Sequence, residues 1–259
     1  MNLTDLLHPV KDIAREAGAA ILDIYARAEG IVIEKKADDS PLTIADQTAN
    51  RIICDRLEKL PRVFPIISEE NRQVAYEIRQ KYTHNWLVDP LDGTKEFIKR
   101  NGEFTVNIAL VQGGKPVLGV VYAPVPDELY WAAAGHGAFL EKNGQTQRLA
   151  AAKFDWSEPG LKVVCSRSHL NAETSAFIET LREPELVSKG SSLKFLILAK
   201  GDAHIYPRLA PTMEWDTGAA QIILEEAGGK VLQWENRKPV TYNKPDLLNP
   251  HFIAFGQAL

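Results

Sequence analysis

The sequence predicts an α/β fold in which helices are layered on β-sheets, and two patterns along the chain lead to this prediction. Residues 104–145 contain apolar strands joined by short turns, which is typical of an antiparallel meander. After residue 160, strands and amphipathic helices alternate, which favours helices packed on the faces of a sheet. The 259 residues, 45% of them hydrophobic, are enough for one large domain or two small ones with a sizeable core.

Before the meander we expect two amphipathic helices and three short strands. Apolar residues recur at helical spacing over residues 10–27, with Pro9 near the start of the helix. A second helix is expected over residues 43–60, closed by Pro61. Apolar runs predict short strands over residues 31–36, 63–68 and 86–88. A polar stretch predicts a turn at residues 37–41.

After the meander, residues 150–160 break the pattern, and we expect a boundary there between an N-terminal half, 1–155, and a C-terminal half, 156–259. The C-terminal half is expected to alternate strands and helices. The predicted strands are 161–166, 185–190, 203–207 and 230–234, and the predicted helices are 171–182, 191–200 and 216–227.

Composition narrows the class of protein. The formal charge is −4, from 30 basic and 34 acidic residues, and no clustered basic face argues for a nucleic-acid partner. The two cysteines lie far apart and in apolar surroundings, which favours two buried free thiols in a reducing cytosol. The N-terminus lacks the basic start and apolar core of a signal peptide, and no apolar run reaches about 18 residues. We therefore expect a cytoplasmic protein.

The most informative motif is WLVDPLDGTKEF at residues 86–97. An apolar strand ends on Asp89, and a second acid, Asp92, follows three positions later, with a proline and a glycine that permit a tight turn. Two ionised carboxylates held close together repel each other unless a cation lies between them. Oxygen ligands favour Mg²⁺, Mn²⁺ or Ca²⁺, whereas zinc more often takes His or Cys. The alternative is a structural turn in which Asp92 caps a helix that begins at Thr94.

Three further acids stand where strands end or helices begin. Glu69 follows one predicted strand as Asp89 follows another, so both carboxylates can lie at the ends of neighbouring strands. Asp216 opens an apolar helix, and Asp46 lies three residues after Thr43. Each has a structural alternative: an exposed loop acid for Glu69, an N-cap for Asp216 and a capping box for Asp46. Several helix starts together would also favour a bound phosphate.

Taken together, these segments resemble the inositol-monophosphatase-like family of metal-dependent phosphatases. The family signature is similar to WLVDPLDGT at residues 86–94 and EWDTGAA at residues 214–220, and the resemblance covers nearly the whole chain. Four stretches are most similar to the bacterial 3′(2′),5′-bisphosphate nucleotidases of this family: residues 92–110, 118–125, 190–195 and 206–216. The resemblance implies a layered α-β-α-β-α sandwich of the inositol monophosphatase and sugar phosphatase type, with the active site between two halves.

The resemblance also implies Mg²⁺-dependent hydrolysis of a phosphate monoester, with two or three Mg²⁺ ions per active site and Mn²⁺ as a substitute. Glu69, Asp89 and the main-chain carbonyl of Leu91 would hold the first ion. Asp89, Asp92 and Asp216 would hold the second, so that Asp89 bridges the two. Inhibition by Li⁺ is expected on the same resemblance.

Catalytic and substrate-binding roles follow from the resemblance as well. Thr94 and Asp46 match the residues that activate the attacking water, and the N–H groups of Gly93 and Thr94 would face the phosphate. The full set of implied substrate-binding residues is Glu69, Leu91, Asp92, Gly93, Thr94, His169, Ser191, Lys194, Arg208 and Asp216.

Four of these residues match positions that contact the nucleotide in the nucleotidases. Ser191 is expected at a helix start with Lys194 one turn on, so that both can face one anion, and Arg208 follows a predicted strand. His169 follows another predicted strand. The alternatives are solvated surface charges for Lys194 and Arg208 and a plain loop residue for His169.

The resulting expectation is an enzyme that converts adenosine 3′,5′-bisphosphate into AMP and phosphate in sulfate assimilation, with the sulfated nucleotide left open as a second substrate. Activity on inositol or fructose phosphates, as an inositol monophosphatase or a fructose-1,6-bisphosphatase, is the alternative. A non-catalytic regulator that binds phosphonucleotides is a different class. The expected partner is a small nucleoside bisphosphate, with a monomer or a homodimer as the assembly. Peripheral attachment to the inner face of the inner membrane is left open by the resemblance.

Overall fold

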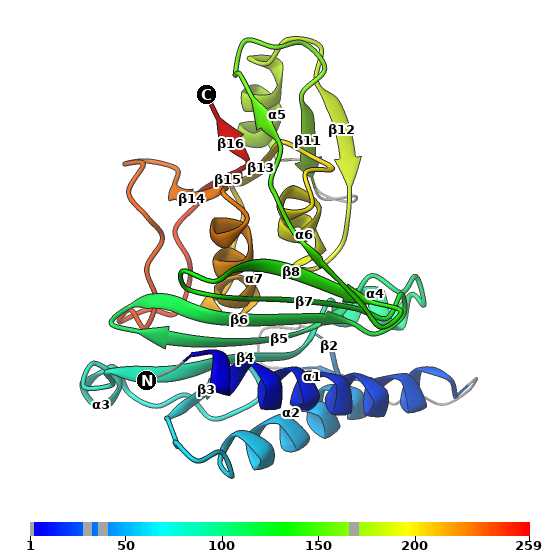
Figure 1. Cartoon of the computed structure of the whole chain (residues 1–259), viewed down its shortest axis with the longest axis vertical. Coiled ribbons are helices and arrows are strands. Elements are labelled where there is room, and N and C mark those ends of the chain that lie inside the picture. Colours follow the sequence, from blue (N-terminus) through cyan, green and yellow to red (C-terminus); the bar gives the residue numbers. More distant parts are fainter. Residues whose placement is uncertain (1–2, 28–32, 36–40, 166–170) are drawn as a thin grey trace.

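The chain is folded into five layers (Figure 1). The structure, a computed structural model, describes residues 3–27, 33–35, 41–165 and 171–259. Two helices cover one face of a large sheet, two more lie between this sheet and a second one, and a fifth covers the outer face of the second sheet. In this order the helices are α1 (Thr4–Tyr25), α2 (Ile44–Leu57), α6 (Leu193–Ala199), α7 (Glu214–Glu226) and α5 (Ala172–Glu179). The predicted α-β-α-β-α sandwich is confirmed.

The large sheet contains the predicted meander. Its seven strands are ordered β3-β4-β5-β6-β7-β8-β9, and all neighbours are antiparallel except β3 and β4, which are parallel. The bounds are β3 (Ile66–Ser68), β4 (His84–Asp92), β5 (Thr105–Gln112), β6 (Lys115–Ala123), β7 (Glu128–Ala133), β8 (Gly137–Lys142) and β9 (Gln145–Arg148). The expected antiparallel meander is thus confirmed.

The second sheet has five strands in the order β12-β11-β13-β15-β14. The first three are mutually parallel, whereas β15 is antiparallel to both of its neighbours. The bounds are β11 (Lys162–Cys165), β12 (Glu185–Ser188), β13 (Ile205–Arg208), β14 (Lys230–Gln233) and β15 (Phe252–Phe255). Strand β15 was not predicted, and it lies between the two strands that the alternation would have made neighbours.

The remaining elements are short. Strand β1 (Ile33–Lys35) pairs with β2 (Pro41–Thr43), and β10 (Lys153–Phe154) pairs with β16 (Gln257–Ala258). Helices α3 (Tyr76–Arg79) and α4 (Thr94–Ile98) complete the described elements. Most of the turn predicted at 37–41 lies outside the described residues. The division of the chain at 155/156 stays a prediction.

Helix α1 begins earlier than predicted. It starts at Thr4, so Pro9 lies inside the helix instead of near its start. Leu6 and Leu7 extend the buried face of the helix by one turn, and burying these side chains outweighs the cost of one missing N–H donor. None of the described helices has the length and apolar character that a membrane span requires.

Other helix boundaries also differ from the prediction, and α5 ends at Glu179, three residues early. Helix α2 ends at Leu57, three residues early, and α6 begins at Leu193, two residues late. Helix α7 begins at Glu214, two residues early, so Asp216 is its third residue and not its N-cap. Both cysteines are free as expected, but Cys54 is only half-buried.

Candidate active site

A register shift in β4 brings the two acids of the WLVDPLDGT motif to one side of the sheet. Asp89 pairs with Asn107 and Asp92 with Thr105, so three steps along β4 match two steps along β5. In a regular strand, residues three apart point to opposite faces, and the one extra residue of a bulge cancels that difference. Both acids therefore lie on the face that packs against α6 and α7, as does Leu87 two residues before Asp89.

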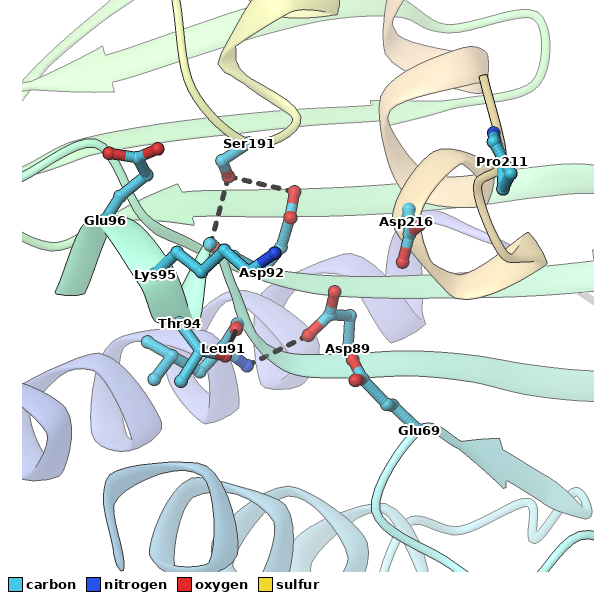
Figure 2. A pocket seen from close by; sticks show the side chains of 11 residues that line it. Glu69, Asp89, Leu91, Asp92, Thr94, Lys95, Glu96, Ser191, Pro211 and Asp216 are labelled. Carbon is cyan, nitrogen blue, oxygen red and sulfur yellow. Dashed lines mark hydrogen bonds between the residues drawn. The ribbon is translucent and has the colours of Figure 1, made fainter. Parts of the chain in front are cut away.

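Three acids from separate elements meet at this end of the sheet. Glu69 follows β3, Asp89 lies in β4 and Asp216 lies in the first turn of α7. A carboxylate oxygen from each lies within 4.8 Å of the others. Figure 2 shows Asp89 between Glu69 and Asp216. Glu69 and Asp89 lie together on neighbouring strands as expected, because β3 and β4 are parallel and the Glu69 N–H donates to the Val88 carbonyl, 3.1 Å away. Asp89 does not end its strand, however, since β4 continues to Asp92.

These acids line a pocket of about 420 Å³, which we call the acidic pocket. It contains every predicted metal ligand, together with residues of α4 and of the loop before α6. Its lining residues are Glu69, Asp89, Leu91, Asp92, Gly93, Thr94, Lys95, Glu96, Ser191, Pro211 and Asp216.

The electrostatics of the acidic pocket fit a bound cation. Burial, and next to it repulsion by Glu69 and by Asp92, raise the pKa of Asp89 well above its usual range. Burial and the charge of Asp92 raise the pKa of Asp216 to about 8. All the donors are carboxylate or carbonyl oxygens, which suits a hard divalent cation. A cation would remove the repulsion that the bare carboxylates experience.

Backbone N–H groups hold one oxygen of each aspartate and leave the other available. The Leu91 N–H donates to Asp89 Oδ1 (3.0 Å), and the Met213 N–H donates to Asp216 Oδ2 (2.9 Å). The N–H of Ser192 donates to Asp92 Oδ2 (2.6 Å).

Asp92 is oriented differently from the other acids. It lines the acidic pocket but lies outside the three-acid group, and its side chain points towards Ser191 (Figure 2). It does not cap α4, because Gly93 occupies the N-cap position of that helix without a side-chain cap. The capping alternative for Asp92 is therefore wrong.

Asp46 and Thr94 form the pair that the sequence predicted. Asp46 Oδ2 accepts hydrogen bonds from the backbone N–H and the hydroxyl of Thr43, each 2.7 Å long, which is the expected capping box. Its other oxygen, Oδ1, accepts from the Thr94 hydroxyl at 3.0 Å. The same hydroxyl lies 3.3 Å from the main-chain carbonyl oxygen of Leu91. The side chain of Leu91 is buried in the core. The capping and catalytic interpretations of Asp46 are therefore compatible.

A second pocket of about 190 Å³ adjoins the acidic pocket and shares Asp92, Ser191 and Asp216 with it. We call it the basic pocket, because Lys194 and Arg208 line it. Lys194 is only 8% exposed, so the surface-charge alternative for this residue is wrong. Its burial lowers its pKa to about 8.

The protein supplies only part of the hydrogen-bond partners that the basic side chains of Lys194 and Arg208 can take. Lys194 Nζ donates to the Ser191 carbonyl at 2.8 Å and lies 5.8 Å from the centre of the Tyr206 ring. Arg208 donates from Nη2 to the Pro211 carbonyl at 2.8 Å, while its buried Nε has no partner among the described residues. Ser191 is not at the start of α6 as predicted; it precedes the N-cap Ser192 and has a left-handed backbone with φ 54°.

Not every site residue could be placed or predicted. His169 lies outside the described residues. Thr105, Asn107 and Ser192, which surround Asp92, were not singled out by sequence reasoning. The available signal was two polar residues at strand spacing, Thr105 and Asn107, in a strand that is otherwise buried on both faces.

Comparison with known proteins gives consistent results. The profile of the inositol monophosphatase family matches residues 2–255. The 3′(2′),5′-bisphosphate nucleotidase CysQ of Escherichia coli O157:H7 is 46% identical over 248 residues, which are 95% of this chain and 98% of that protein. The protein of the same name from Salmonella typhimurium is 46% identical over 247 residues, with the same coverage. The crystal structure of CysQ from Bacteroides thetaiotaomicron, a bacterial member of the inositol monophosphatase family, is 42% identical with a TM-score of 0.86, and the match covers 98% of this chain and 97% of that one.

Proposed function

The chain belongs to the inositol monophosphatase family, and from this premise we propose that it is a metal-dependent 3′(2′),5′-bisphosphate nucleotidase. Its substrate is adenosine 3′,5′-bisphosphate, and its products are AMP and phosphate. The observation that supports this best is the shared wall between an acidic pocket that suits divalent cations and a basic pocket that suits a second phosphate. A monophosphate substrate has no need of the second pocket.

The acidic pocket is the proposed reaction centre, with Mg²⁺ as the cation and Mn²⁺ as a substitute. Glu69, Asp89 and the Leu91 carbonyl are the proposed ligands of one ion, and Asp89, Asp92 and Asp216 those of another. Two bound divalent cations would activate a water molecule and stabilise the leaving oxygen in an in-line displacement.

Thr94 and Asp46 are the proposed residues that orient the attacking water. The Thr94 hydroxyl directs its proton to Asp46 Oδ1, so the oxygen of that hydroxyl can accept a hydrogen bond from water. Asp46 is held by its cap on Thr43, which fixes the direction of this acceptor. Together they would hold a water at the α4 end of the acidic pocket, which Gly93 and Thr94 also line.

The basic pocket is the proposed site for the phosphate that is not cleaved. Lys194 and Arg208 supply two positive charges, and the buried Nε of Arg208 gains a partner when an anion binds. Ser191 lines both pockets and can contact the nucleotide between them. His169 keeps its proposed role as a nucleotide contact.

The experiment that tests this function compares the kinetics of phosphate release from adenosine 3′,5′-bisphosphate, inositol 1-phosphate and fructose 1,6-bisphosphate at saturating Mg²⁺. We expect kcat/KM to be highest for the nucleotide by at least tenfold. A preference for inositol 1-phosphate or fructose 1,6-bisphosphate would favour the alternative phosphatase activities. Tight nucleotide binding without phosphate release would favour the non-catalytic regulator.

Location and assembly remain proposals as well. We expect a cytoplasmic protein, with peripheral attachment to the inner face of the inner membrane left open. We expect its assembly to be a monomer or a homodimer. Fractionation of cells and size measurement in solution test them.

A further inference from the structure

A cluster of buried polar side chains lies directly behind Asp92. Thr105, Asn107 and Ser192 are 0%, 1% and 2% exposed, and none of them lines the acidic pocket. The Thr105 hydroxyl lies 2.8 Å from the hydroxyls of both Ser191 and Ser192. The Ser192 hydroxyl donates to Asn107 Oδ1 at 2.9 Å, and the Thr105 hydroxyl reaches the same oxygen at 3.3 Å.

This cluster fixes one oxygen of the Asp92 carboxylate. Asp92 Oδ2 accepts from the Ser192 N–H at 2.6 Å, the Ser191 hydroxyl at 2.9 Å and the Asn107 amide at 3.4 Å. The Ser191 hydroxyl also lies 3.1 Å from the Asp92 main-chain carbonyl. No described residue donates to Asp92 Oδ1, so the carboxylate is held by one oxygen while the other remains available.

The cluster joins two distant parts of the chain. Thr105 and Asn107 belong to β5 of the large sheet, whereas Ser191 and Ser192 precede α6. The loop before Ser191 is attached to the same region, because the Gly190 N–H donates to Glu103 Oε2 at 2.8 Å. Consequently the orientation of Asp92, which lies in β4, depends on contacts with both parts.

We propose that Thr105, Asn107 and Ser192 are positioning residues that set the orientation of Asp92 and thereby the affinity of the acidic pocket for its second cation. This inference rests on the proposed function. Carboxylates that bind metals are themselves held by hydrogen bonds, and removing such outer partners typically costs ten- to a hundredfold in metal affinity or activity. The Thr105 hydroxyl is the common member of the cluster, since it reaches Ser191, Ser192 and Asn107.

Replacing Thr105 by valine keeps its shape and removes its hydroxyl. We expect Thr105→Val to raise the dissociation constant of the weaker Mg²⁺ site roughly ten- to a hundredfold in a calorimetric titration of the metal-free chain. Activity at subsaturating Mg²⁺ should fall in parallel, and high Mg²⁺ should restore most of kcat. Thr105→Ser retains the hydroxyl and should bind Mg²⁺ nearly as the wild type does. Thr174 is also a buried threonine, but it lies in α5, so Thr174→Val is the matched control and should change neither Mg²⁺ affinity nor activity.

Failure of the inference can be distinguished from failure of the proposed function. If the wild-type chain binds Mg²⁺ at two sites and Thr105→Val binds it equally well, the positioning role is overturned while the proposed function stands. If the wild type binds no divalent cation, the proposed function is overturned and the inference with it. Should Thr105→Val fail to fold, Ser192→Ala removes the neighbouring hydroxyl and carries the same expectation for Mg²⁺ affinity.

Discussion

The carboxylate of Asp46 divides its two oxygens between the fold and the pocket. Oδ2 closes the capping box of α2 through Thr43, and Oδ1 receives the Thr94 hydroxyl 48 residues further along the chain. The cap holds the carboxylate still, which is a requirement for orienting a catalytic hydroxyl. A structural and a catalytic interpretation of one acid need not exclude each other.

Asp89 is the residue whose loss should matter most. As the acid nearest the centre of the three-acid group, it is the proposed bridge between two cations, so Asp89→Asn should remove nearly all turnover. The substitution also removes a buried charge that its neighbours repel, so the metal-free variant should melt at or above the temperature of the metal-free wild type. Steady-state kinetics and thermal melting in EDTA check both expectations. Activity near that of the wild type at saturating Mg²⁺ would contradict the bridging role.

The raised pKa values of Asp89 and Asp216 predict how the stability of the metal-free protein depends on pH. A carboxyl group with a raised pKa in the folded state binds its proton more tightly there than in the unfolded chain, where its pKa is about 3.9. Its stabilising contribution is therefore complete below pH about 4 and is lost as pH rises towards the folded pKa, which is about 8 for Asp216.

In EDTA, the free energy of unfolding should accordingly decline between pH 5 and pH 8, and saturating Mg²⁺ should reduce that decline because cations replace the protons. Urea unfolding across this pH range measures both slopes, with Asp89→Asn in EDTA as a control of shallower slope. Equal slopes with and without Mg²⁺ would show that these acids do not share a cation.

Lys194 should determine substrate choice. A hydrogen bond to a charged group contributes roughly 1.5–3 kcal/mol, and about 1.4 kcal/mol corresponds to a factor of ten. Lys194→Met should thus lower kcat/KM for adenosine 3′,5′-bisphosphate roughly ten- to a hundredfold, while the poorer hydrolysis of adenosine 3′-monophosphate should hardly change. Lys200→Met, at the exposed end of the same helix, is the matched control. If kcat/KM falls equally for both substrates, Lys194 supports the fold or the cation site and does not bind the second phosphate.

At the scale of elements, β4 explains why the motif places its two acids three positions apart. The sequence predicted a strand that stops at Val88, whereas β4 continues to Asp92 with a shift in register after Asp89. The composition of the motif indicated a turn at this point but not a bulge. A bulge is defined by the pairing with β5, and nothing within one strand specifies how its partner is aligned.

Some residues of the site are predictable from the sequence and others are not, for the same physical reason. Asp46, Glu69, Asp89 and Thr94 stand at the ends of predicted strands or at helix starts, where an acid or a hydroxyl is conspicuous in the sequence. Helix α7 and the meander were predictable because their apolar periodicity is strong. By contrast, the contacts that hold Asp92 come from strand β5 and from the loop before α6, and strand β15 inserts between strands that are near in sequence order. Such long-range pairings leave no local signal.

Helix α7 approaches the large sheet closely at Gly119 of β6. A Cβ atom at this position would overlap the Ala219 carbonyl oxygen and the Ile222 side chain, both of α7. Gly119→Ala should therefore push α7, which carries Asp216, away from the sheet. We expect a loss of about 1–3 kcal/mol in the free energy of unfolding and a weaker affinity for Mg²⁺.

Gly18 of α1, which packs against the opposite face of β6, offers a matched comparison for that substitution. A Cβ atom on Gly18 would overlap the ring of Tyr122 in β6. Gly18→Ala therefore strains the contact between α1 and the sheet without affecting α7. Thermal melting and Mg²⁺ titration of the two variants separate the effects. Unchanged Mg²⁺ affinity in Gly119→Ala would mean that the position of α7 does not control the acidic pocket.

At the scale of the whole molecule, the active site lies where the large sheet meets the middle helix layer. The sheet supplies Glu69, Asp89 and Asp92, and the segments that follow it in the chain supply Asp216 and the basic pocket. In the proposed arrangement, the large sheet and α7 would hold the cations, and Lys194 of α6 and Arg208 of β13 would hold the second phosphate in the adjoining pocket. This arrangement would allow a bisphosphate to be recognised at both of its charged ends.

The most direct test of this account is ³¹P NMR of adenosine 3′,5′-bisphosphate incubated with the full chain and Mg²⁺. The 3′-phosphate resonance should disappear, inorganic phosphate should appear in equal amount, and the 5′-phosphate resonance should persist as that of AMP. The reaction should stop in EDTA and in Asp89→Asn. Release of the 5′-phosphate, or release of either phosphate at the same rate in EDTA, would contradict a metal-dependent reaction centre that is specific for the 3′-position.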